Sequence, residues 1–534
     1  MTGVNTIQRM GAGRWRCGVC LFELADHIAP DRNDLPYQNS LPPEHVSGRG
    51  QSRPIIGDRL KESTSRGCET CILISHCVYR PPSPFHAVWQ QGEIHSYINP
   101  ASLQIFVLKF SEASLSLNPF ITIGDVPTGD TGSEAALKKA AEWILQSSQE
   151  HQVCNKAVAE ARRMPERLLY IEHMASFNIR LVEDADMLPP ESYVCLSHRW
   201  MPETTAVGLT AERAETFRKQ IPRSTLYPLL SDALEVTYRL GLRYIWIDCL
   251  CIYQHDLGDW HSQAAEMAAI YENAFLTISA LSCGPGPNAD KRLFSRRHPD
   301  KPLRSLRSKE GTVCFFREIH NHAHPFWVSP ADNKSGTMKS LPEFSLTQRG
   351  WAYQARILSR RILHFSRREL IWDCQEALLC ECRYREHNWR KAKLATPDIS
   401  HIPRTEIVCE YSKTSLSKSS DKLPALSGIA KRVGEARGWN YLAGLWVECL
   451  KEQLTWGVRC DQAEIRPRLR QLPSWSWASV NGQLEFWDSS NSHIEIISHG
   501  VVNGPNPYGI PKSTQLVISG PCVPATLASI VKPS

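Results

Sequence analysis

The sequence predicts an α/β fold in which a parallel β-sheet is flanked by helices and elaborated with additional α+β segments. Three observations in the centre of the chain support this prediction. Short apolar runs alternate with amphipathic patterns from residue 193 to residue 281. The run RYIWIDCLCIY, residues 243–253, is apolar almost throughout, as in a strand buried on both faces of a sheet. Helical patterns follow the first two strands, which is the order of a βαβ unit.

Five elements make up the predicted unit, and turn signals separate them. Gly241 closes the first helix, because glycine readily takes the left-handed conformation found just beyond helix ends. Asp259 lies where an acid at the N-cap or in the first turn favours the helix dipole. The elements are a strand followed by a turn at 193–200, strands at 243–253 and 275–281, and helices at 226–242 and 259–274.

Less regular segments surround this unit. Residues 134–163 have apolar positions at helical spacing and are predicted as a helix, and another helix is predicted around 426–453. LPSWSWAS alternates tryptophan with serine, so Trp475 and Trp477 are predicted on one face of a strand. Three cysteines of WDCQEALLCEC are interpreted as the core of a further strand: Cys374, Cys380 and Cys382.

The composition is that of a soluble globular protein with more than one domain. The 534 residues are 42% hydrophobic and 22% charged, and the net charge of +6 is small for this length. This balance argues against an extended nucleic-acid surface. The first residues contain no apolar signal core, and no run approaches the roughly 18 apolar residues of a membrane helix. We therefore expect a cytoplasmic protein with reduced cysteines.

A Cys-containing module is predicted over residues 1–90. Two CxxC units, one in CGVC and one in GCETC, flank a loop rich in proline and glycine. Together they offer four thiolates to a tetrahedral structural zinc ion. The alternative is that each pair packs in the core of the module. The four cysteines are Cys17, Cys20, Cys68 and Cys71.

Polar side chains follow two of the predicted strands. The segment from Ser197 to Trp200 lies just beyond the first, and Asp248 lies at the end of the second. If the strands are neighbours, a hydroxyl, a cation, an indole and a carboxylate converge on one crevice, which suits a nucleotide. Alternatively, Asp248 accepts hydrogen bonds from its own turn, and Trp200 is a core aromatic. The intervening residues are His198 and Arg199, and Cys249 and Cys251 are interpreted as packing residues.

The helix at 259–274 presents one inward stripe. Trp260 and Gln263 begin it, and apolar residues continue it at helical spacing. Gln263 therefore faces inward one turn after Trp260. Its amide does not ionise, so it does not serve as a general base. Glu266 is the nearest acid, displaced around the helix, and either substitutes for an acid here or is a solvated charge.

Four segments, taken in order, resemble the heterokaryon incompatibility (HET) domain of filamentous fungi. They are YVCLSHRW, LGLRYIWIDCLCIYQHDLGDWHSQAAEMAAIYENAFLTISA, RGWAYQARILSRRILHFS with IWDC, and LPSWSWAS. The upstream MPERLLYIE is also typical of the family. The resemblance implies a role in non-self recognition and regulated cell death. HET domains are in turn remotely similar to TIR domains, which implies a TIR- or flavodoxin-like sheet, and some TIR domains cleave NAD.

The resemblance also implies site residues. Arg349, Trp351 and Gln354 match the family pattern RxWTLQE, but Ala355 replaces its acid. Gln263 likewise replaces the glutamate of DWxxE. An NAD glycohydrolase would then rely on Asp248 and Glu266 as catalytic residues. The ligand would be bound by Ser197, His198, Arg199, Trp200, Trp260, Gln263, Arg349, Trp351 and Gln354.

Three functions stay open at this point: a recognition or cell-death effector, an NAD glycohydrolase, and a HET-fold protein with a metabolic or regulatory role. The sequence has no P-loop and no repeat array, so a protein partner is expected to supply the sensor, with self-association as a further expectation. The expected domains are the module 1–90, a connecting region 91–185, the HET core 186–360 and a C-terminal α+β extension 361–534.

Overall fold

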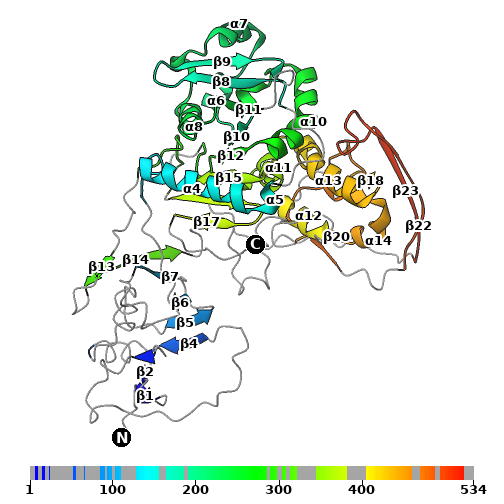
Figure 1. Cartoon of the computed structure of the whole chain (residues 1–534). Helices are drawn as coiled ribbons and strands as arrows, with labels where there is room; N and C mark the ends of the chain where they lie inside the picture. The colour runs from blue at the N-terminus through cyan, green and yellow to red at the C-terminus, as the bar shows by residue number, and fades with distance from the viewer. Residues whose placement is uncertain are drawn as a thin grey trace, which may run out of the picture.

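The structure is a computed structural model of the chain. It describes residue 65 and residues 128–155, 164–185, 191–285, 289–296, 344–367, 369–381, 404–459, 469–487 and 493–521, with the backbone of nine short strands elsewhere. Those strands form small antiparallel sheets (Figure 1). They are β1 (Ile7–Arg9), β2 (Trp15–Cys17), β3 (Glu23–Leu24), β4 (Ser52–Ile55), β5 (Phe85–Gln90), β6 (Glu93–Ile98), β7 (Leu103–Lys109), β13 (Arg304–Arg307) and β14 (Val313–His320).

An eight-stranded sheet lies at the centre, in the order β17-β16-β15-β12-β10-β11-β8-β9 (Figure 1). Its four inner strands are parallel, and an antiparallel pair extends the sheet on each side. The α/β prediction is therefore confirmed. The strands are β8 (Leu168–His173), β9 (Asn178–Val182), β10 (Tyr193–Ser197), β11 (Tyr244–Ile247), β12 (Leu276–Ser279), β15 (Arg361–Phe365), β16 (Leu370–Cys374) and β17 (Leu378–Cys380).

Helices connect the parallel strands as a βαβ unit requires. Between β10 and β11 the chain forms α6 (Pro202–Ala206), α7 (Ala211–Lys219) and α8 (Pro228–Arg239). Gly241 follows α8 with a φ of 82°, so its predicted role in closing this helix is confirmed. Between β11 and β12 lies α10 (Leu257–Asn273).

The strand predicted over 243–253 is wrong beyond Ile247. β11 ends there, and Asp248–Cys251 forms a single helical turn, α9. The carboxylate of Asp248 accepts the backbone N–H of Cys249 at 2.7 Å, which bends the chain away from the sheet. Cys249 and Cys251 are fully buried, and burial raises the pKa of the Cys251 thiol to about 12. Both cysteines are packing residues, as the sequence indicates.

The helix α10 begins slightly earlier than predicted. Its N-cap is Asp256, whose carboxylate accepts the backbone N–H of Asp259 at 3.0 Å. Asp259 thus occupies the first turn rather than the cap. Gln263 is buried, together with Met267, in the inward stripe that the spacing predicts.

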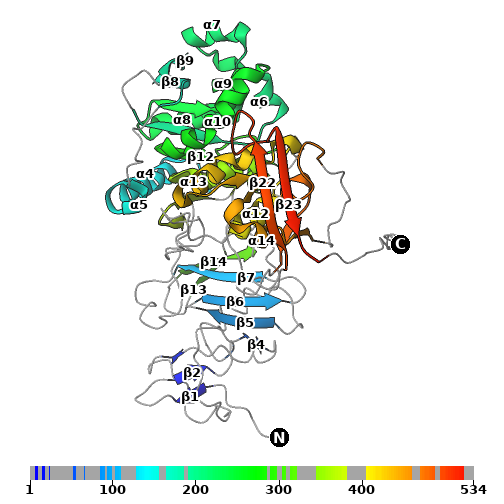
Figure 2. The same cartoon turned by 90° about the vertical axis from the view of Figure 1, so that its right-hand side faces the viewer.

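A second core occupies the C-terminal part of the chain (Figure 2). Tyr411 and Trp477 are among its most deeply buried side chains. Its helices are α11 (Gly350–Leu358), α12 (Arg404–Ser412), α13 (Ser427–Arg437) and α14 (Leu450–Gln453). Its strands form three two-stranded antiparallel sheets, β18–β19 (Tyr441–Leu442, Leu445–Trp446), β20–β21 (Trp456–Val458, Leu484–Phe486) and β22–β23 (Glu495–Val502, Ser513–Ser519).

Two predictions in this part are wrong. The helix predicted around 426–453 ends at Arg437, because Gly438 takes a left-handed φ of 67° and terminates it. LPSWSWAS is not a strand: it turns and then forms the short 3₁₀ helix Trp477–Ser479. The Ser476 side chain accepts the backbone N–H of Ala478 at 3.2 Å, a local cap that competes with strand pairing.

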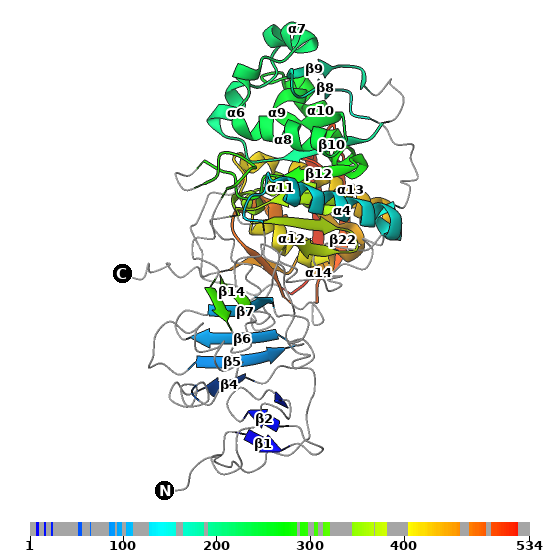
Figure 3. The ribbon, with the colours of Figure 1, turned by 60° about the vertical axis from the view of Figure 1, so that its left-hand side comes forward.

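The helix predicted over 134–163 is divided into α4 (Glu134–Glu150) and α5 (Gln152–Asn155), and residues 156–163 lie outside the described residues. Ser133 caps α4 by accepting the backbone N–H of Ala136 at 3.2 Å. Figure 3 shows α4 lying across the sheet, where it packs against β16.

We predict that Trp477→Ala destabilises the protein by roughly 3–5 kcal/mol, because it leaves a large cavity and removes the indole hydrogen bond to Gly444. Trp475→Ala, a half-buried neighbour, serves as the control and should cost roughly 1–2 kcal/mol. Denaturant midpoints measure both. Equal losses would contradict the difference in burial.

Candidate functional site

The carboxyl ends of two central strands meet at one edge of the sheet. β10 and β11 are adjacent and parallel, with Leu196 opposite Ile247, so the residues after each strand emerge side by side. β12 pairs with the other side of β10. β10 thus lies at a switch in strand order, where ligands bind in open α/β sheets. β8 runs antiparallel to β11 and begins at this edge, which brings Glu166 and Arg167 to it.

Asp248 is held by a tryptophan and by its own turn. Its Oδ2 accepts the indole N–H of Trp200 at 2.6 Å, and its Oδ1 accepts the backbone N–H of Cys249 at 2.7 Å. The side chain is 16% exposed. Asp248 therefore accepts a hydrogen bond from its own turn, which is one interpretation of the sequence. It also accepts one from Trp200, which follows the neighbouring strand β10.

His198 lies behind this carboxylate. Its side chain is fully buried, with Nδ1 3.6 Å from Asp248 Oδ1, and neither ring nitrogen has a hydrogen-bond partner among the described residues. Burial lowers the pKa of His198, the Arg349 charge lowers it further, and Asp248 opposes both. The imidazole is thus neutral at neutral pH, with unused hydrogen-bonding capacity beside Asp248.

Arg349 lies near Asp248, and Arg199 lies near Arg349. Burial lowers the pKa of Arg349, the Asp248 charge opposes this, and the Arg199 charge adds to it. Ser197 is buried and hydrogen-bonds Tyr271, whose hydroxyl donates to Leu196 O at 3.3 Å. Guanidinium groups in such an enclosed place are suited to bidentate contacts with phosphate or carboxylate.

The predicted aromatic residues also meet. Trp260 on α10 and Trp351 on α11 make an edge-to-face contact with centroids 6.3 Å apart. The Trp351 indole donates to Asp421 Oδ2 at 3.3 Å. Gln354 faces elsewhere: it is buried, and its Oε1 accepts the backbone N–H of Gly428, on α13, at 2.8 Å. The structure therefore places Gln354 between the two cores rather than beside Asp248.

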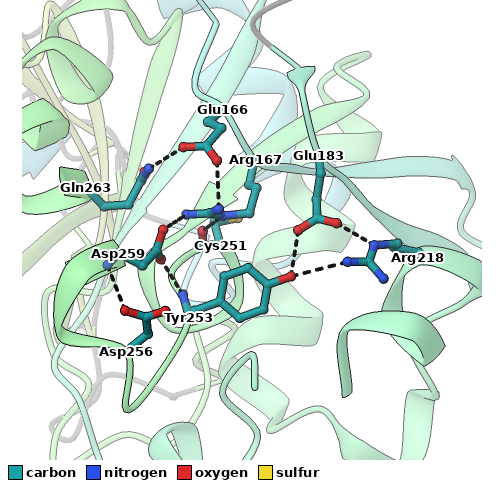
Figure 4. Close-up of polar contacts among 9 residues, drawn as sticks. All are labelled: Glu166, Arg167, Glu183, Arg218, Cys251, Tyr253, Asp256, Asp259 and Gln263. Carbon is teal, nitrogen blue, oxygen red and sulfur yellow. Dashed lines mark hydrogen bonds and ion pairs between the residues drawn. The ribbon is translucent and has the colours of Figure 1, made fainter. Parts of the chain in front are cut away.

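Gln263 contacts an acid that the sequence analysis did not single out (Figure 4). Its amide donates to Glu166 Oε2 at 2.8 Å, while Arg167 pairs with Glu166 Oε1 at 2.9 Å. Arg167 also pairs with Asp259 and donates to Cys251 O. The Glu166 side chain is 47% exposed, so a carboxylate faces solvent next to Gln263. The signal in the sequence was the family-typical MPERLLYIE, which contains Glu166.

Glu266, the acid nearest to Gln263, and Ala355, which replaces an acid of the family pattern, lie in different environments. Glu266 is exposed and has no ion pair or hydrogen bond among the described residues, which is the environment of a solvated charge. Ala355 is buried in the core of the central sheet, where an ionised side chain would need a partner. The predicted zinc ligands Cys17, Cys20, Cys68 and Cys71 are not tested, since their side chains lie outside the described residues.

A cavity of about 480 Å³ lies in the C-terminal part, and none of the predicted site residues lines it. Lys422 contributes to its wall and donates to Asn481 Oδ1 at 2.9 Å. Burial lowers the pKa of Lys422 to about 8.

The parallel sheet, with polar groups gathered at its carboxyl edge, defines an α/β domain. Residues 193–355 match the family model described as "Heterokaryon incompatibility protein (HET)". The chain therefore contains a HET domain, as its motifs indicate. No curated protein and no solved structure matches the chain. Among the described residues, no helix is long and apolar enough to cross a membrane.

We predict that His198 titrates below the ordinary histidine pKa of about 6.5. Asp248→Asn should lower that pKa further, because the carboxylate favours the imidazolium, and Arg349→Gln should raise it. Histidine NMR signals followed against pH measure this, with His198→Gln assigning the resonance. A pKa above the ordinary value would contradict the assignment.

The lowered pKa of His198 makes the stability of the folded protein depend on pH. The unfolded chain binds a proton at His198 more readily than the folded protein does. This contribution to stability is therefore fully present above about pH 6.5 and is lost as the pH falls through the folded-state value.

Proposed function

We propose that this protein is an effector or signalling protein of fungal heterokaryon incompatibility that acts in regulated cell death. The match of residues 193–355 to the HET family carries this proposal. The polar groups at the carboxyl edge of the sheet support this proposal, because they offer a place where the effector binds a ligand. We also propose that the protein acts in the cytoplasm and that the module 1–90 binds structural zinc.

We propose association with a protein partner or a second copy through the hairpin β22–β23. Ile496 and Leu516 pack one side of the hairpin against the C-terminal core. Ile497, Val502 and Ile518 are each more than half exposed. Ile518 pairs with Ile496 and lies on the same side of the ribbon as Leu516, yet it is 51% exposed. Exposed β-branched residues on a two-stranded ribbon, whose outer edges pair with no other described strand, are typical of an association surface.

The test uses a double variant of the hairpin. Ile497→Asp with Ile518→Asp should weaken association about tenfold or more, because charges replace apolar contact area. Light scattering of the purified protein measures self-association, and survival of a filamentous fungus after induced expression measures the effector role. The double variant should increase survival.

Leu145→Asp is the matched control, since Leu145 is 57% exposed but lies on α4. It should behave like the unchanged chain in both assays. A double variant that associates and kills as the unchanged chain does would reject the hairpin as the surface. Survival unaffected by expression of the unchanged chain would reject the effector role itself.

A second candidate function is NAD glycohydrolase activity, favoured by one observation. Glu166 supplies an exposed carboxylate beside Gln263, where the family resemblance implies an acid. In such a reaction the bond between nicotinamide and ribose breaks with its electron pair on nicotinamide. A carboxylate stabilises the positive charge that develops on the ribose. Water then adds to the ribose carbon and loses its proton to a base. Arg199 and Arg349 would bind the diphosphate.

Nicotinamide release from NAD by the purified full chain tests this candidate. Asp248→Asn and Glu166→Gln should each lower turnover about 100-fold if the crevice is the active site. Glu266→Gln should leave it unchanged if this exposed acid is only solvated. No turnover at high protein concentration would eliminate the enzyme and leave an effector or a HET-fold protein with a regulatory role.

A further inference from the structure

Three side chains that bind soft metal ions meet where α4 and α5 pack against the sheet. His151 follows the last residue of α4, and Cys154 lies on the single turn of α5. Cys374 is the last residue of β16. Both cysteines are buried, while His151 is half-buried. More than 200 residues separate Cys374 from the other two in the chain, so the packing of α4 on β16 brings them together.

The distances between the ligand atoms fit one tetrahedral ion. His151 Nδ1 lies 3.6 Å from Cys154 Sγ and 3.3 Å from Cys374 Sγ. All three atoms lie within 4.8 Å of one another. With Zn–S near 2.3 Å and Zn–N near 2.05 Å, a tetrahedral site needs a sulfur–nitrogen separation of about 3.5 Å. The observed pair of distances brackets that value, so shifts of a few tenths of an ångström would suffice.

The surrounding backbone holds the two cysteines in place. Glu376 Oε1 accepts the backbone N–H groups of Val153 at 2.6 Å and Cys154 at 3.4 Å, which joins α5 to the turn after β16. The backbone N–H of Ala377 donates to Cys374 Sγ at 3.3 Å. The Glu376 contacts fix the backbone that carries Cys154, and the Ala377 N–H stabilises the thiolate form of Cys374.

We propose that His151, Cys154 and Cys374 bind a Zn²⁺ ion that fastens α4 and α5 to β16. Imidazole and two thiolates are ligands that Zn²⁺ favours, and each thiol releases its proton on binding. No fourth histidine, cysteine or acid belongs to this cluster among the described residues, so water from the exposed side of His151 completes the tetrahedron. Cys374 pairs with Arg361 at the start of β15, so the site lies at the sheet edge opposite the carboxyl ends of the parallel strands.

The test uses the full, reduced, metal-stripped chain titrated with Co²⁺, whose visible absorption reports tetrahedral thiolate coordination. Cys374→Ser should lose one equivalent of bound Co²⁺ relative to the unchanged chain, and Zn²⁺ should displace that equivalent. The conservative Cys380→Ser removes another buried thiol, on the adjacent strand β17, and should lose none. The equivalent of Co²⁺ expected at the N-terminal cysteines is common to all three proteins and cancels in the comparison.

His151→Gln provides a second variant at a half-buried position, so it should fold even if Cys374→Ser does not. It should weaken Zn²⁺ binding at this site about tenfold or more. Zn²⁺ should raise the melting temperature of the unchanged chain more than that of either variant. Equal metal content in well-folded unchanged chain and Cys374→Ser would overturn the proposal. A Cys154–Cys374 disulfide found by mass spectrometry in protein isolated under reducing conditions would also overturn it.

Discussion

Parallel pairing of β10 with β11 on one side and β12 on the other is the constraint on which the rest of the structure depends. The three strands are buried almost throughout, so each backbone polar group must pair with a neighbouring strand. β10 is the first of them in the chain but lies between the other two. The connection from β10 leads to β11 on one side, whereas the connection from β12 leads to β15 on the other side. The carboxyl ends at such a reversal are where ligands bind in open α/β sheets.

The polar groups at this edge differ in how many of their hydrogen-bonding positions are already occupied by protein partners. Asp248 already accepts an indole N–H and a backbone N–H, so it holds Trp200 and the α9 turn in position. His198 has two ring nitrogens without partners among the described residues, and Glu166 is partly exposed. An incoming ligand would therefore gain most from the residues around Asp248. Ala355 is buried in the core of the central sheet, where a small apolar side chain needs no charged partner.

The HET match ends inside α11, but the sheet does not. β15, β16 and β17 follow the matched residues and extend the sheet, while β8 and β9 precede them. α11 itself belongs to both cores, because Ala355 packs with the sheet whereas Tyr353 packs with the C-terminal residues. The Gln354 hydrogen bond to α13 joins them further. The C-terminal part thus supports the HET domain from one side.

The sequence by itself determined the order of strands and helices, the inward position of Gln263 and the placing of Asp248 at a strand end. Periodicity and an apolar run are local properties, so a single segment specifies them. The sequence could not show that Gln263 contacts Glu166 or that Cys154 lies beside Cys374. The residues of each pair are distant in the chain, and only the strand order and the packing of helices bring them together. The turn at Asp248 that ends β11 is likewise held by the indole of Trp200, which comes from a distant segment. These outcomes needed the tertiary structure, since the free energy that selects them lies in contacts between distant segments.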